Sequence, residues 1–202
     1  MSDAPIQVST TSLLLDGLRD EDNRVVWEEF DRRYRPILYG FALRLRLEPA
    51  DAADVAQETL LRFVQEYRAG KYDRGQGRLR AWLIGIARYR IADVRRDQAR
   101  KRIARGESAM GELVGEDEAE RLWDLEQRRF IFHSALAELR GSSRLNERTI
   151  EAFERVVLRR QPVREVAAEL GVTPQEIYDA KSRVVEKLRE SLQKYKSLLA
   201  DE

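Results

Sequence analysis

The chain has no cysteine and only one histidine among its 202 residues. Without cysteine it can form no disulfide, no zinc–thiolate site and no thiol nucleophile. The histidine, His133, stands next to Phe132 in a helical run, and no pattern of histidines or carboxylates around it suggests a catalytic site. We therefore expect a packing or surface role for His133, and we expect no metal site, no cofactor and no enzyme activity.

Long apolar runs are missing as well. No stretch approaches the roughly 20 apolar residues that a membrane-spanning helix needs, and the N-terminus lacks a signal-peptide pattern. Charged residues make up 36% of the chain, and the mean hydropathy is −0.58, which indicates helices with extensively solvated faces. These properties predict a cytoplasmic protein with no membrane insertion.

The formal net charge of +1 conceals two blocks of opposite sign. From Arg74 to Arg105 there are 11 basic residues against two acidic ones, Asp93 and Asp97. From Glu107 to Glu126 there are eight acidic residues against one arginine. The basic block suits a phosphate-binding surface, whereas the acidic block, which follows Gly106 and contains Gly111 and Gly115, is typical of a mobile linker.

The secondary structure expected from the sequence is entirely helical, because apolar residues recur at helical spacing and β-branched alternation is nearly absent. The helix-compatible stretches are 12–19, 25–46, 51–69, 79–103, 119–140, 147–159, 163–170 and 174–199. We predict an all-α fold of two small helical domains, at 11–105 and 119–199, joined by a flexible charged linker at 106–118.

Residues 162–189, PVREVAAELGVTPQEIYDAKSRVVEKLR, predict a helix-turn-helix. Gly171 can adopt the left-handed conformation that ends a first short helix, Thr173 is a good N-cap, and Pro174 suits the first position of a second helix. Such a unit can place side chains in the major groove of DNA, although an ordinary helical hairpin is the alternative. The candidate DNA contacts are Arg164, Thr173, Gln175, Glu176, Tyr178, Asp179, Lys181, Ser182 and Arg183. Of these, Glu176 and Asp179 are repelled by phosphate, but an acidic side chain can accept a hydrogen bond from a cytosine amino group.

The helix expected at 51–69 carries a second stripe besides its apolar one. An exposed leucine stands there among carboxylates and amides, which suits a polar-rimmed contact with another protein. A solvated face with one accidental leucine is the alternative. The candidate contact residues are Asp54, Gln57, Glu58, Leu61, Arg62 and Gln65.

The segment 71–82, KYDRGQGRLRAW, combines two glycines with an aromatic residue and arginines. Such a loop can hold a base that has left the stack of the duplex, and a plain interhelical turn is the alternative. The helix that follows presents further arginines for phosphates and base edges, while Trp82 is expected to pack in the core. The candidate DNA contacts are Tyr72, Arg74, Arg78, Arg80, Arg88, Tyr89, Arg95 and Arg96.

Together, the segments DAADVAQETLLRF, RLRAWLIGIARYRIADVRR and 162–189 resemble the extracytoplasmic-function (ECF) sigma factors of bacterial RNA polymerase. The resemblance runs from Thr11 to Leu192 in the family's order. It implies that the first segment binds core RNA polymerase, the second reads the −10 promoter element, with the glycine loop capturing a −10 base, and the third reads the −35 element. The variant YDAKSRVVEKLR and the leader at 12–34 are similar to ECF sigma factors common in planctomycetes.

The expected function is therefore that of a sigma factor, whose partners are core RNA polymerase and promoter DNA. Whether an anti-sigma factor or another regulator controls it stays open. The alternative is a helix-turn-helix repressor or activator that binds duplex DNA without polymerase and has no use for the 51–69 stripe or the glycine loop. An enzyme with a DNA-binding tail is poorly supported, because the chain has one histidine, no cysteine and no phosphate-binding glycine motif.

Overall fold

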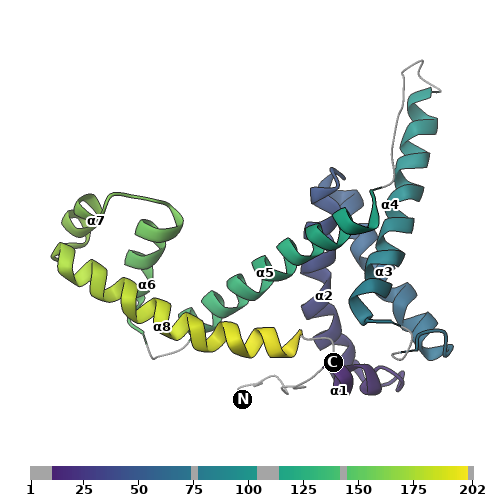
Figure 1. The fold of residues 1–202 in the computed structure, drawn as a ribbon, viewed down its shortest axis with the longest axis horizontal. Helices are drawn as coiled ribbons and strands as arrows, with labels where there is room; N and C mark the ends of the chain where they lie inside the picture. Colours follow the sequence, from purple (N-terminus) through teal and green to yellow (C-terminus); the bar gives the residue numbers. More distant parts are fainter. Residues whose placement is uncertain (1–10, 74–76, 104–113, 142–144, 200–202) are drawn as a thin grey trace. The chain divides into compact units, whose positions relative to one another are not determined.

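The computed structural model describes residues 11–73, 77–103, 114–141 and 145–199, and all regular elements in these ranges are helical (Figure 1). The all-α prediction is confirmed. The elements are α1 (Thr11–Gly17), α2 (Arg24–Arg44), α3 (Pro49–Arg68), α4 (Leu79–Ile103), α5 (Glu116–Gly141), α6 (Glu147–Phe153), the π-helix η1 (Glu154–Leu158), α7 (Val163–Leu170) and α8 (Pro174–Leu198). Among the described helices, none has the length and apolar character needed to cross a bilayer.

The chain divides into two compact units. Unit 1 comprises Met1–Phe130 and Leu199–Glu202, and unit 2 comprises Ile131–Leu198. The first half of α5 belongs to unit 1 because Ala119 and Trp123 are buried there, with the Trp123 ring edge-on to Phe41 at a centroid distance of 6.3 Å. The acidic segment expected to be linker thus includes the docked start of a helix, while 104–113 lies outside the described residues.

The core of unit 1 forms where α3 packs between α2 and α4. α3 begins at Pro49, a residue suited to the first helical turn, and buries one face along its whole length. The Phe63 ring at the centre of this face lies 5.4 Å from the Phe30 ring of α2 and 5.6 Å from the ring of Tyr72. This packing fixes which face of α3 is left to solvent.

In unit 2, α8 supplies one side of two adjoining apolar clusters. Val184 and Leu188 pack with residues of α5 and α6, while Ile177 packs with α7 and with Ala152 of α6. Gly171 ends α7 with a φ of 64°, the left-handed conformation that the sequence predicts for it. The two helices and their turn thereby present the outer face of the first half of α8 to solvent.

Candidate functional site

The predicted protein-contact stripe lies along the exposed face of α3. All six of its residues are exposed, and Leu61 at its centre retains 45% of its surface. The opposite face of the helix is buried, from Ala52 to Tyr67. The side chains of the stripe are thus free of the core, and a large apolar residue stands exposed among polar ones.

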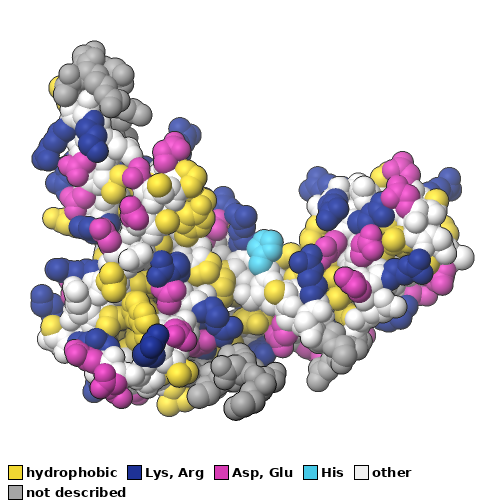
Figure 2. Space-filling model, turned by 180° about the vertical axis from the view of Figure 1, so that it is seen from behind, with side chains coloured by type: hydrophobic (Ala, Val, Ile, Leu, Met, Phe, Trp, Pro, Cys, Tyr) yellow, Lys and Arg dark blue, Asp and Glu magenta, His cyan; other side chains and the backbone are white. Residues whose placement is uncertain are grey.

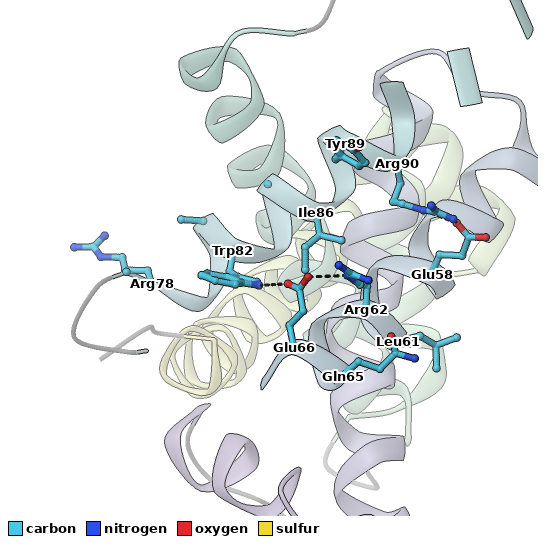
Figure 3. Close-up of a pocket in the computed structure, with 13 residues that line it drawn as sticks. Glu58, Leu61, Arg62, Gln65, Glu66, Arg78, Trp82, Ile86, Tyr89 and Arg90 are labelled. Atoms are coloured by element: carbon cyan, nitrogen blue, oxygen red, sulfur yellow. Dashed lines mark hydrogen bonds and ion pairs between the residues drawn. The ribbon is translucent and has the colours of Figure 1, made fainter. Parts of the chain in front are cut away.

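A groove of about 870 Å³ separates this stripe from α4 (Figure 3). Leu61 of α3 and Trp82 and Ile86 of α4 contribute its apolar lining. Its polar lining comes from both sides, and includes Arg62 from the predicted protein-contact set and Arg78 from the predicted DNA-contact set. The structure therefore brings together two groups of residues that sequence reasoning treated separately.

Glu66 is a residue of this groove that sequence reasoning missed. Its carboxylate accepts hydrogen bonds from Nε1 of Trp82, at 3.0 Å, and from Nε of Arg62, at 2.6 Å (Figure 3). The spacing of Arg62 and Glu66 on one helix is a signal for their pairing. The sequence holds no such signal for the hydrogen bond between Glu66 and Trp82, which lie on different helices. This bond joins α3 to the start of α4.

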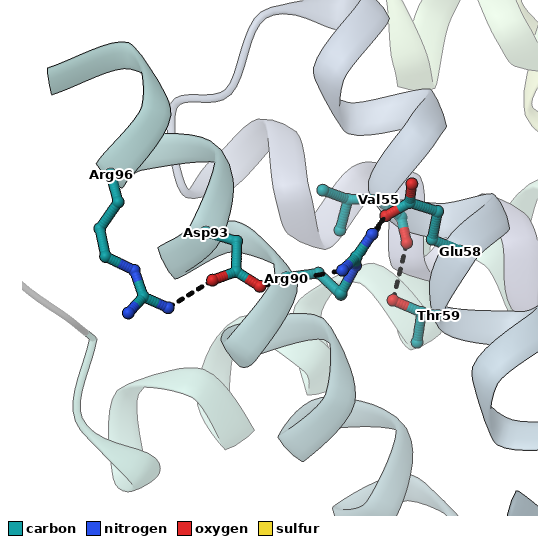
Figure 4. A network of polar contacts seen from close by, with 6 residues as sticks. All are labelled: Val55, Glu58, Thr59, Arg90, Asp93 and Arg96. Atoms are coloured by element: carbon teal, nitrogen blue, oxygen red, sulfur yellow. Dashed lines mark hydrogen bonds and ion pairs between the residues drawn. The ribbon is translucent and has the colours of Figure 1, made fainter. Parts of the chain in front are cut away.

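A second polar connection between α3 and α4 runs through Arg90, which was also missed (Figure 4). Its Nε donates to Oε2 of Glu58 at 2.6 Å, and its Nη1 lies 3.8 Å from a carboxylate oxygen of Asp93. Asp93 in turn pairs with Arg96. Glu58 of the predicted protein-contact stripe is thus linked through two side chains, Arg90 and Asp93, to Arg96 of the predicted DNA-contact set.

Tyr72, which the sequence predicts as a −10 contact, is largely buried in the structure. Its side chain is only 8% exposed, and its ring contacts the rings of Phe63, Tyr67 and Trp82. Its hydroxyl donates to the backbone carbonyl of Gly77 at 3.2 Å, across the loop. Because three aromatic rings surround it, the Tyr72 ring is packed against α3 and α4 and leaves little of its surface to solvent. Arg74 lies outside the described residues.

The remaining predicted contacts on α4 fall into two groups. Tyr89 is 65% exposed, and Arg96 is exposed with its guanidinium 6.0 Å from the Tyr89 ring centre. The other three arginines are engaged within unit 1: Arg95 donates to the carbonyl of Leu45 at 2.7 Å, and Arg80 and Arg88 contact the start of α5. Figure 2 shows Lys and Arg side chains along the end of α4, with Asp and Glu between them.

The outer face of α8 presents the residues predicted to contact DNA. Gln175, Tyr178, Lys181, Ser182 and Arg183 are exposed, as is Arg164 on α7. Asp179 is exposed too, and its carboxylate accepts a hydrogen bond from Nε2 of Gln175 at 3.0 Å. An amide and a carboxylate therefore lie side by side on the exposed face of α8.

Glu176 has a structural role at the start of α8. Its carboxylate accepts from the backbone N–H of Thr173 at 2.7 Å and from the Thr173 hydroxyl at 2.9 Å. The Glu176 N–H in turn donates to Oγ1 of Thr173, at 3.2 Å, which completes a reciprocal cap. The bond from the Thr173 backbone, followed by that from its hydroxyl, lowers the pKa of Glu176 below its ordinary value. The Thr-x-x-Glu spacing is the sequence signal for this role.

Two comparisons with known proteins identify the family of the chain. One covers much of its first unit, and the other covers most of its length. A model of Sigma-70 region 2 matches residues 30–101, which include α3 and nearly all of α4. The chain is 31% identical over 160 residues to the ECF RNA polymerase sigma factor SigL of Mycobacterium tuberculosis, in strains Erdman, CDC 1551 and H37Rv. This similarity covers 78% of the chain and 83% of SigL. The planctomycete subgroup stays a prediction, but the family is shown: the chain belongs to the ECF sigma factors of RNA polymerase.

Proposed function

We propose that the chain binds core RNA polymerase through α3 and directs transcription initiation by opening the −10 element and binding the −35 element. The observation that carries this proposal is the groove between α3 and α4. The exposed stripe centred on Leu61 forms one wall, and the basic and aromatic start of α4 forms the other. Polymerase bound to the first wall would therefore lie next to DNA bound to the second.

On the polymerase side, the contact consists of Asp54, Gln57, Glu58, Leu61, Arg62 and Gln65. Leu61 supplies the apolar centre, and the surrounding carboxylates and amides form a polar rim of the kind that protein interfaces have. A single buried leucine within such a rim can contribute a large part of the binding energy, because its surface leaves water completely on association.

On the DNA side, the −10 element is contacted by Arg78, Tyr89 and Arg96, which are exposed in the structure. Arginines bind phosphates, and the exposed Tyr89 ring can stack on an unpaired base. Unstacking a base costs a few kcal/mol, and these contacts offset that cost without any covalent step. Tyr72 is buried beside Trp82 and helps to position the start of α4, and Arg74 stays a predicted contact of the same basic block.

The −35 element is bound by the outer face of α8, with Gln175, Asp179 and Arg183 at successive positions along one side. The hydrogen-bonded pair of Gln175 and Asp179 is suited to base edges, since an amide can donate and accept while a carboxylate can accept from cytosine. Arg183, one turn farther along, is placed for the phosphate backbone. Glu176 caps the helix, and we assign it no contact with a base.

The experiment that tests the polymerase contact is the double variant Glu58→Arg/Leu61→Arg. It should lose co-elution with core RNA polymerase on gel filtration, because both the apolar centre and one rim carboxylate become cationic. The matched control is Val25→Arg/Glu28→Arg on α2, which also replaces an exposed apolar residue and an exposed glutamate three positions apart. Far-ultraviolet circular dichroism checks that both variants remain helical.

Retained co-elution of Glu58→Arg/Leu61→Arg would overturn the assignment of α3 as the polymerase contact. Loss of co-elution in both double variants would show that added positive charge on unit 1 is enough to prevent binding, and would overturn it equally.

A further inference from the structure

Two arginines of α4 that the sequence predicts as −10 contacts, Arg80 and Arg88, contact the start of α5 and the residues just before it. Nη1 of Arg80 donates to Oδ1 of Asp124 at 2.8 Å, and its Nη2 donates to Oε2 of Glu120 at 3.1 Å. Nη2 of Arg88 donates to the carbonyl of Val114 at 2.7 Å. Its Nη1 also lies 3.5 Å from the carboxylate of Glu116.

The acidic residues involved, Glu116, Glu120 and Asp124, are spaced four apart and therefore share one face of α5. Their carboxylates face Arg80 and Arg88 of α4. Among the described residues of the acidic block at 107–126, these three carboxylates lie against arginines of the basic block.

The same stretch of helix is anchored by buried contacts on its inner side. Trp123 is almost fully buried against Phe41, and Glu126 is 4% exposed and pairs with Arg44 of α2. The Glu126 carboxylate lies directly over Gly40 of α2, where a Cβ atom would stand 2.7 Å from its Cδ. Only a glycine leaves room for this anchor.

The buried contacts of Trp123 and Glu126 differ from the ion pairs of Arg80 and Arg88 in how easily competing ions can replace them. The side chains of Glu120 and Asp124 are 56% and 40% exposed, so water and ions reach them. Exposed ion pairs of this kind contribute about 0.2–1 kcal/mol each and give way to competing ions. The Glu126 carboxylate and the Trp123 ring are buried, so these contacts can keep α5 docked while the exposed pairs open.

We propose that the first half of α5 is an autoinhibitory clasp, whose carboxylates occupy Arg80 and Arg88 until DNA phosphates replace them. This inference rests on the proposed function, because it takes α4 as the DNA-binding surface. Carboxylates and phosphates compete for the same guanidinium donors, so the clasp lowers the affinity of the free protein for any DNA. A dense row of phosphates, as promoter DNA in the holoenzyme offers, then displaces the acids.

The test is the double variant Glu120→Gln/Asp124→Asn, which removes both charges facing Arg80 and keeps the size of the side chains. The control is Asp117→Asn/Glu118→Gln, which removes the same net charge from exposed positions in the first turn of the same helix. The measurement is the dissociation constant of the full chain, without polymerase, for a fluorescein-labelled single strand of mixed sequence. Fluorescence anisotropy is recorded over a series of salt concentrations.

We expect Glu120→Gln/Asp124→Asn to bind about three- to tenfold more tightly than the control, which corresponds to two exposed ion pairs released. The slope of log affinity against log salt should also steepen by about one unit, because one more arginine contacts phosphate. Adding Arg80→Ala to the variant should remove both gains.

Equal affinities of the variant and the control would overturn the clasp, and so would a gain that survives Arg80→Ala, since the acids would then act only through overall charge. Failure of the proposed function looks different. In that case the wild type and all variants show no measurable DNA binding even at low salt, and the DNA surface itself is refuted.

Discussion

Replacing Gly40 with alanine tests how α5 is anchored on α2, because two effects of opposite sign meet at this position. In the interior of a helix, alanine is favoured over glycine by about 0.8–1 kcal/mol. At Gly40, however, the new Cβ would stand 2.7 Å from Cδ of Glu126 and closer still to its Oε2. The carboxylate has to move, and its bond to Arg44 is then lost.

The second effect is the larger one. Breaking a buried ion pair typically costs about 3–5 kcal/mol, because a charge is left without its partner. Here Glu126 is buried but the side chain of Arg44 is 40% exposed, so water compensates in part and we expect a cost of about 2–3 kcal/mol. After subtraction of the helix preference, Gly40→Ala should destabilise unit 1 by about 1–2 kcal/mol.

Urea unfolding followed by tryptophan fluorescence measures this change for unit 1 alone. The chain has three tryptophans, Trp27, Trp82 and Trp123, and all of them lie in unit 1. The transition therefore reports on unit 1 even if unit 2 unfolds separately.

Gly85→Ala is the matched control, because Gly85 lies inside α4 and a Cβ there meets nothing within 4 Å. It should stabilise unit 1 by up to about 1 kcal/mol. In a Glu126→Ala background, Gly40→Ala should become stabilising by a similar amount, since the clash is gone. If Gly40→Ala raises the urea midpoint of the otherwise unchanged protein as Gly85→Ala does, the reasoning about the anchor is refuted.

Three further predictions concern α8. The lowered pKa of Glu176 means that its cap stabilises unit 2 at pH values above the ordinary carboxyl pKa. This stability is lost as the pH falls through the lower pKa of the folded state. Glu176→Gln should therefore make the melting temperature, followed by circular dichroism, fall less steeply towards acid pH, and an unchanged pH dependence would show that the cap adds nothing. Asp179→Ala should relax the base preference at one −35 position by about 1–3 kcal/mol in a binding-site selection. Arg183→Ala should instead weaken binding to all sequences alike and lower the salt slope by about one unit. A selection in which Asp179→Ala alters no position would leave specificity to Gln175 and its other neighbours.

The sequence alone determined the helices and the exposed stripes, because both depend on neighbours three or four residues away. Apolar spacing placed α3 and α8 and left the side of Leu61 to solvent. Gly171 and the Thr173–Pro174 pair marked the turn between α7 and α8 through backbone conformation and capping, which are local properties. The ECF family could likewise be recognised from short segments, and the comparison with SigL confirmed it.

Only the tertiary structure decided which distant side chains meet. The sequence shows a basic block followed by an acidic one, but it does not indicate that Arg80 faces Asp124 while Arg96 stays exposed. Nor does it indicate that the ring of Tyr72 is enclosed by the rings of three other residues. A charged or aromatic side chain on a helix surface has many partners of suitable chemistry. The packing of α5 against α2, possible because Gly40 leaves room for Glu126, brings Asp124 to Arg80, and the packing of α3 against α4 encloses Tyr72.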